Sequence, residues 1–238
     1  MGMPITVEIV GANNDKDISK VYTYFKSIDA RFSPYKRNSE LNKINKGLKK
    51  DQWSDQMKEV MKLCDQTKQI SGGYFDIKRS DGTVDTSGLV KGWAIDNAAK
   101  ILLDAGIENF YIEAGGDIAA YGNNEDGEPW LVGIRNPFEQ NEIVKRVKLS
   151  NKGMATSGLY VRGDHIYDPM HEHKIPKKVA SLSVIGPNIF EADRFATAAF
   201  AMDSAGVSFI AALPELEAYQ IDQQGVATFT QGFNNYVV

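Results

Sequence analysis

The sequence has a single cysteine, Cys64, and three histidines in 238 residues. One cysteine cannot form an internal disulfide, so the fold does not depend on oxidation, and a helical pattern around Cys64 favours a role in core packing. No segment approaches the roughly 18 uninterrupted apolar residues of a membrane helix, and the N-terminus has no charged-then-apolar export signal. These absences predict a soluble, cytoplasmic protein, unless a leader has been removed.

The sequence also lacks an excess of basic charge. It has 27 Lys and Arg against 31 Asp and Glu, which gives a formal net charge of −4. Its basic residues form no long run, so nothing indicates a nucleic-acid partner. Internal repeats, low-complexity segments and flexible linkers are absent too. A chain of this length can bury a sizeable core as one large or two small domains.

What the sequence does contain is helical and strand periodicity in alternation, which is typical of an α+β fold. Helical spacing and stop signals predict helices over residues 17–31, 55–70, 91–105 and 188–201, a short helix from residue 38 or 39, and a helix closed by Leu213-Pro214. Strand patterns and turn residues predict strands over residues 5–10, 74–77, 109–113, 118–121, 130–135, 144–149, 179–185, 218–221 and 226–230.

The stretch TVDTSGLVKGWAID, residues 83–96, places a carboxylate, two hydroxyls, a glycine and a lysine at the start of a predicted helix. Free N–H groups and the positive end of the helix dipole favour phosphate at such a position. The stretch has no complete phosphate-loop motif, so a capped helix start with a solvated lysine is the other interpretation.

A second candidate site lies in the predicted helix over residues 188–201. Asp193 and Thr197 stand four residues apart and therefore share a face. Their two hard oxygen ligands suit magnesium bound together with a substrate phosphate. A hydrogen bond between the two side chains on a polar face is the simpler alternative.

Three further features have more than one interpretation. Gly115 and Gly116 follow a predicted strand, which indicates close approach of the backbone to a ligand or to a neighbouring strand. Tyr35 is either a loop anchor or a platform for a flat ligand. His165 is either structural or catalytic. His171 and His173 lack matching metal ligands elsewhere, and we expect them to face solvent.

The order of seven segments is more informative than any one of them. They are FSPYKRNSELNKIN, GGYFD, VDTSGLVKGWAIDNAAKIL, IEAGGDIAAYG, WLVGIRNP, ATSGLYVRGDHIYDP and EADRFATAAFAM. In order and character the set resembles the FAD:protein FMN transferase (ApbE) family over nearly the whole chain. The resemblance implies an α+β, T-fold-like architecture with mixed or antiparallel sheets, formed by residues 1–238 as one domain of two interleaved lobes with the active site between them.

The resemblance also implies a reaction, and it assigns residues to it. A magnesium-dependent enzyme of this kind cleaves FAD and attaches FMN to a threonine or serine of a target flavoprotein, releasing AMP. The family pattern implies magnesium ligands at Asp193, Thr197 and the Gly88 carbonyl, with Asp193 also counted among the catalytic residues. It implies a proton-handling role for His165, whose ordinary pKa of about 6.5 suits a general base. The implied FAD contacts are Met1, Tyr35, Tyr74, Phe75, Asp76, Asp85, Lys91 and Ile166.

Two departures from the family pattern concern the loops. The connection from Asp76 to Asp85 is short, so the lid over the ligand is reduced or supplied differently. Residues 170–173, MHEH, replace a threonine–glycine pair, which affects local contacts and the choice of acceptor. Two other functions remain open from the residues: an FAD pyrophosphatase that transfers FMN to water, and an FAD-binding protein without turnover.

Overall fold

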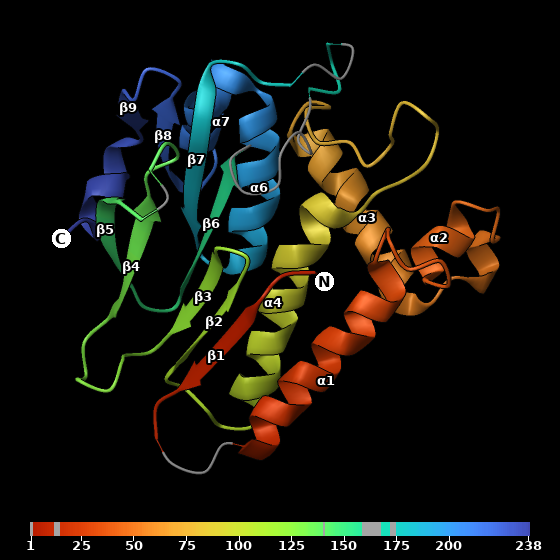
Figure 1. Ribbon diagram of the computed structural model, residues 1–238, viewed down its shortest axis with the longest axis horizontal. Coiled ribbons are helices and arrows are strands. Elements are labelled where there is room, and N and C mark those ends of the chain that lie inside the picture. Colours follow the sequence, from red (N-terminus) through yellow and green to blue (C-terminus); the bar gives the residue numbers. More distant parts are fainter. Residues whose placement is uncertain (1, 12–14, 140, 159–167, 172–174) are drawn as a thin grey trace.

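The computed structural model describes residues 2–11, 15–139, 141–158, 168–171 and 175–238. Within these residues, seven strands form a sheet in the order β1-β2-β3-β6-β7-β8-β9, and β4 pairs with β5 apart from it (Figure 1). All these pairings are antiparallel. The strands are β1 (Ile5–Ile9), β2 (Phe110–Ala114), β3 (Asp117–Tyr121), β4 (Trp130–Arg135), β5 (Ile143–Leu149), β6 (Lys152–Gly158), β7 (Val179–Gly186), β8 (Glu217–Asp222) and β9 (Ala227–Phe229).

Two long helices cover one face of the large sheet. α4 (Ser87–Asp104) contacts β2 and β3, α6 (Ile189–Ala201) contacts β6 and β7, and the two helices pack against each other. α1 (Asp15–Phe32) lies on the outer side of α4 (Figure 1). The other helices of the described residues are α2 (Glu40–Ile44), α3 (Asp55–Ile70), α7 (Gly206–Ala211) and the 3₁₀ turns η1 (Lys50–Gln52), η2 (Asp203–Ala205) and η3 (Gln231–Tyr236).

Apolar residues form a core on each face of the sheet. The larger core joins α4 and α6 to the sheet and to α1, and includes Leu89, Leu102 and Ile112. Both helices bury residues around most of their circumference, as expected for helices between a sheet and an outer helical layer. The smaller core lies between the sheet and the β4–β5 pair, and includes Trp130 and Phe233. This architecture confirms the predicted α+β class with antiparallel sheets.

Two predicted elements were wrong or incomplete, and one strand was not predicted. Residues 74–77 are not a strand, because the chain leaves α3 through two glycines with positive φ and the Phe75 N–H donates to Ser71 Oγ at 3.0 Å. The helix predicted from Lys91 begins at Ser87. β6 was not predicted, although it lies in the sheet between β3 and β7. None of the helices in the described part of the chain has the length and hydropathy needed to cross a bilayer.

Candidate active site

A close contact between α4 and α6 forms the floor of the site. A Cβ on Gly92 would lie 2.5 Å from the Cβ of Asp193 and 2.9 Å from the carbonyl oxygen of Ile189. Carbon atoms do not pack so closely, so this crossing requires glycine. The bare backbone also allows the Gly92 N–H to donate to Asp193 Oδ2 at 2.7 Å. The contact therefore fixes the Asp193 carboxylate relative to α4.

A hydroxyl and a carbonyl oxygen lie at the same junction. Thr197 Oγ1 donates to the Gly88 carbonyl oxygen at 3.2 Å, so the Thr197 hydroxyl bonds across to α4. Asp193 and Thr197 share a face of α6, and both line one cavity with Gly88. Adjacent ligands of an octahedral Mg²⁺ at about 2.1 Å are about 3 Å apart. The spacing of the Thr197 and Gly88 oxygens suits that geometry.

The donor set fits a cation that is shared with a ligand. Within the described residues, no three acidic, histidine or cysteine side chains converge as a metal cage. Mg²⁺ commonly takes one or two protein carboxylates and completes its shell with water and substrate phosphates. One carboxylate, one hydroxyl and one backbone carbonyl therefore match a magnesium that also binds a phosphate-bearing molecule.

A buried lysine–aspartate pair lies beside Asp193. Lys91 Nζ is 2.6 Å from Asp117 Oδ2 and 3.5 Å from Asp193 Oδ1. The Lys91 side chain is 13% exposed and the Asp117 side chain is fully buried. Burial raises the pKa of Asp117, the Lys91 charge opposes that rise, and the Asp193 charge adds to it. The interpretation of Lys91 as a solvated lysine was therefore wrong.

These groups open into a cavity of about 930 Å³, measured with its open mouth. The cavity brings together many residues that the family pattern implied: Tyr74, Phe75, Asp76, Asp85, Gly88, Lys91, Asp193 and Thr197. Its other lining residues are Arg79, Ser87, Gly115, Thr156, Ser157, Gly158, Pro169 and Ala201.

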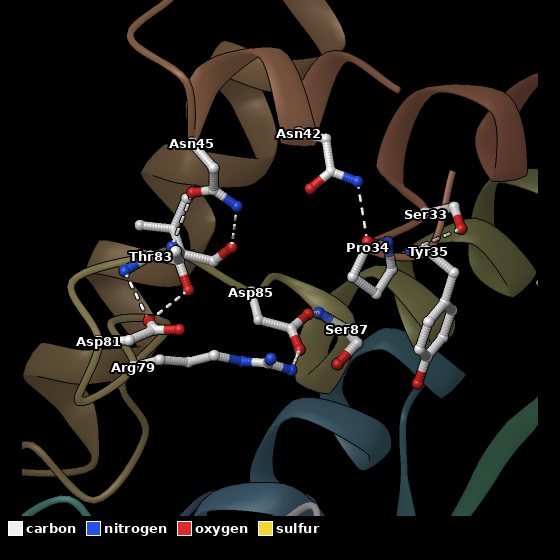
Figure 2. Close-up of polar contacts among 11 residues, drawn as sticks. Ser33, Pro34, Tyr35, Asn42, Asn45, Arg79, Asp81, Thr83, Asp85 and Ser87 are labelled. Atoms are coloured by element: carbon white, nitrogen blue, oxygen red, sulfur yellow. Dashed lines mark hydrogen bonds and ion pairs between the residues drawn. The ribbon is translucent and has the colours of Figure 1, made fainter. Parts of the chain in front are cut away.

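Tyr35 does not line this cavity. It is 94% exposed. It lies in a turn in which its N–H donates to Ser33 Oγ at 3.3 Å and Asn42 Nδ2 donates to the Pro34 carbonyl at 2.8 Å (Figure 2). Tyr35 is therefore not a buried loop anchor, and its ring is accessible to a partner. The predicted residues Met1, His165 and Ile166 lie outside the described residues.

The short connection, residues 76–85, folds into a closed hairpin (Figure 2). Lys78 and Val84 form an antiparallel bridge at its base. Asn45 fastens the hairpin to α2, because its Oδ1 accepts the Val84 N–H at 2.9 Å and its Nδ2 donates to the Val84 carbonyl at 3.0 Å. The reduced lid expected from the sequence is thus a hairpin with fixed ends.

This hairpin brings a second cation to the cavity wall. The Arg79 guanidinium pairs with Asp85, whose other oxygen accepts the Ser87 N–H at 3.0 Å and so caps the first turn of α4 (Figure 2). Asp76 likewise pairs with Lys68 at 2.6 Å. Sequence reasoning did not identify Arg79, because a hairpin position alone does not show which way a side chain points.

The second departure from the family pattern, residues 170–173, is described in part. Asp168 Oδ2 is 2.7 Å from His171 Nδ1, and the His171 side chain is 65% exposed, as expected. The Met170 sulfur lies 2.8 Å from the place where a Cβ on Gly73 would be, so this loop packs against the end of α3. His173 lies outside the described residues.

Asp117, which sequence analysis did not identify as a site residue, is the first residue of β3 and directly follows a glycine turn. Gly115 and Gly116 have φ values of +61° and +92°, as a two-residue type I′ hairpin requires, and Ala114 pairs with Asp117 across it. The two glycines therefore serve the turn itself. A Cβ on Gly116 would have no atom within 4 Å, so the predicted close approach to a neighbouring strand was wrong for Gly116, whereas Gly115 lines the cavity. In the sequence, Asp117 is a carboxylate directly after a glycine turn. That position could have marked it as a candidate, but it does not indicate the pairing with Lys91.

Fold and cavity define a class of protein in which two helices, packed on an antiparallel sheet, present hard oxygen atoms and a lysine to one cavity. Comparison with known proteins gives the family. The sequence profile described as the ApbE family matches residues 1–79 and 77–220, and the chain belongs to this family.

Curated relatives and solved structures agree with this membership. An FAD:protein FMN transferase of Vibrio cholerae is 33% identical over 162 residues, which cover 64% of this chain and 47% of the relative. One of Haemophilus influenzae is 32% identical over 148 residues, covering 58% and 43%. These matches thus span about half the length of each relative.

The solved structures resemble the fold over almost the whole chain. The flavin transferase ApbE from Vibrio cholerae superposes with a TM-score of 0.87 at 23% identity, covering 99% of this chain and 96% of that one. An ApbE protein from Thermotoga maritima gives a TM-score of 0.84 at 21% identity, covering 98% and 95%. At these identities the likeness concerns the fold.

Proposed function

We propose that this chain is a magnesium-dependent flavin transferase. It cleaves FAD and attaches the FMN moiety through a phosphoester bond to a threonine or serine of a target flavoprotein, and AMP is released. The observation that carries the proposal is the meeting of Gly88, Asp193 and Thr197 oxygens beside Lys91 at one cavity floor. Membership of the ApbE family, with relatives named FAD:protein FMN transferase, supplies the substrate.

The cavity walls carry charged side chains that suit a charged ligand. Lys91 and Asp85 are the proposed contacts to FAD, and Lys91 places a positive charge beside the cation site, where the pyrophosphate would bind. Arg79 adds a second positive group on the wall. The remaining proposed FAD contacts are Met1, Tyr35, Tyr74, Phe75, Asp76 and Ile166.

The reaction is a substitution at the phosphorus of the FMN half. A new bond forms between the acceptor hydroxyl oxygen and this phosphorus, while the bond to the bridging oxygen breaks and AMP leaves. We assign the hydroxyl proton to His165, a general base of suitable type. Asp193, Thr197 and the Gly88 carbonyl would hold the magnesium ion, which would supply charge neutralisation at the pyrophosphate. Such transfers depend mainly on positioning and electrostatic stabilisation.

Incubation with FAD, magnesium and a protein bearing an acceptor threonine tests the proposal. We expect AMP and a covalently fluorescent acceptor that survives denaturing electrophoresis. An acceptor with the threonine replaced by alanine is the control and should stay unlabelled. AMP accompanied only by free FMN would indicate a pyrophosphatase, and unchanged FAD would indicate a binding protein; either result contradicts the transferase.

Two predictions from the sequence, the cellular location and the domain organisation, remain predictions. A cytoplasmic location is proposed, and fractionation of cells that produce the protein would test it. The single domain of residues 1–238 with two interleaved lobes is also proposed, and one cooperative calorimetric transition is the expected result.

A further inference from the structure

Asp117 is a fully buried carboxylate that lies behind the cavity wall. Its Oδ2 is 2.6 Å from Lys91 Nζ, and its Oδ1 accepts the Thr156 N–H at 3.3 Å. Lys91 and Thr156 line the cavity, whereas Asp117 does not. Any effect of Asp117 on a ligand in the cavity would therefore pass through Lys91, through Thr156, or through Asp193, whose carboxylate raises the pKa of Asp117. The contact to Lys91 is shorter than the one to Thr156.

Among the described residues, two carboxylates lie within 4 Å of the Lys91 ammonium. A lysine head is a compact charge on a flexible stem, so its place depends on its partners. Asp193 Oδ1 lies 3.5 Å from this ammonium, and a closer pairing there would compete with a cation for the same carboxylate. The contact of 2.6 Å to Asp117 keeps the ammonium nearer the carboxylate that does not line the cavity.

A contribution to folding stability alone does not explain the buried Asp117–Lys91 pair. Taking charges out of water costs several kcal/mol per ion, and replacing both members of a buried pair by apolar groups is often neutral or stabilising. An ordinary pair exists on the same helix for comparison: Asp96 and Lys100 are 2.8 Å apart, with the Lys100 side chain 59% exposed. The Asp117–Lys91 pair differs because its cation lines the cavity beside Asp193.

We propose that Asp117 is a positioning residue of the site. It holds the Lys91 ammonium where it can pair with a phosphate of FAD, and it keeps that ammonium from occupying Asp193, which stays available to the cation. This inference rests on the proposed function, because FAD and the divalent cation are the ligands concerned.

The test compares Asp117→Asn, Lys91→Met and the double variant in two binding measurements without turnover. Flavin fluorescence in a chelator gives the Kd for FAD, and electron paramagnetic resonance of Mn²⁺ without FAD gives the Kd for the cation. The asparagine keeps an acceptor for the Thr156 N–H, so the variant removes the carboxylate charge of Asp117 while the hydrogen bond to Thr156 is kept. Asp96→Asn is the matched control for loss of a buried aspartate and should match the wild type in both constants.

The expected pattern is specific to positioning through Lys91. Asp117→Asn weakens FAD and Mn²⁺ binding about tenfold each, since it releases the ammonium onto Asp193. Lys91→Met weakens FAD binding similarly and does not weaken Mn²⁺ binding. The double variant matches Lys91→Met in both constants, because Asp117 then has no ammonium to position. Additive losses in the double variant would overturn the inference.

A purely structural pair gives a different result. In that case Asp117→Asn lowers the Tm while both binding constants stay at wild-type values, which overturns the inference. Should the single variant not fold, the double variant removes both charges of the Asp117–Lys91 pair and still decides: weaker Mn²⁺ binding than Lys91→Met contradicts positioning. If the constants behave as expected but the wild type releases no AMP, the transferase proposal fails and the positioning role stands.

Discussion

Replacing Gly92 by alanine perturbs the site at the helix crossing that forms it. The added methyl would lie 2.5 Å from the Cβ of Asp193, whereas carbon atoms pack best at about 3.5–4.0 Å. The two helices must therefore separate by about 1 Å. Overpacking of this kind costs about 1–3 kcal/mol. The higher helix propensity of alanine than of glycine offsets about 1 kcal/mol of this loss of stability. We expect a net loss near 1 kcal/mol, which lowers the Tm of a chain of this size by about 3 °C.

The effect on activity should be much larger than the effect on stability. A displacement of about 1 Å between groups that must act together can reduce a rate about 100-fold. The assay is AMP release from FAD at saturating magnesium, with calorimetry on the same sample. Lys100→Ala, at an exposed position of α4, is the control and should retain the wild-type rate. A folded Gly92→Ala protein with the wild-type rate would refute this account of the site.

Three other predictions concern the hairpin, the thiol and the hydroxyl. Asn45→Ala removes two hydrogen bonds to the hairpin of residues 76–85, worth about 2 kcal/mol together, so trypsin should cleave there about 30-fold faster than in the exposed control Asn235→Ala; equal rates would contradict the fastening role. Burial raises the pKa of the Cys64 thiol, so its stabilising contribution is complete below the ordinary thiol pKa of 9.0 and is lost as pH rises further. Ellman's reagent should therefore label Cys64 only on unfolding, and fast labelling of native protein at pH 8 would show that the thiol is accessible. Thr197→Val should raise the magnesium concentration for half-maximal AMP release about tenfold, and an unchanged value would remove the hydroxyl from the cation site.

Much of the fold could be predicted because local patterns agree with the final packing. The helix over Asp55–Ile70 has its predicted bounds, since Ser54 caps its start and glycines follow its end. Asn188 likewise caps α6, with its side chain accepting the Glu191 N–H. β6 was missed because the GMATSG segment has small and polar residues, and only its two neighbouring strands give it a place in the sheet.

The site was predictable to the extent that its residues form local groups. Asp193 and Thr197 share a helix face by spacing alone, and their sequence pattern indicated a cation site. The partner groups could not be derived in this way, because Gly88, Lys91 and Asp117 meet them only through packing of α4, α6 and β3. Gly92 is the clearest example, since its role depends on a helix about a hundred residues later.

We propose that a magnesium ion binds where α4 meets α6 and that cleavage of FAD depends on it. Asp193→Ala tests this claim most directly, with AMP measured by chromatography across a magnesium titration and the Tm measured in parallel. If Asp193 binds the magnesium ion, the variant should fold and release no AMP in response to magnesium. Magnesium-dependent AMP release at the wild-type rate from this variant would contradict it.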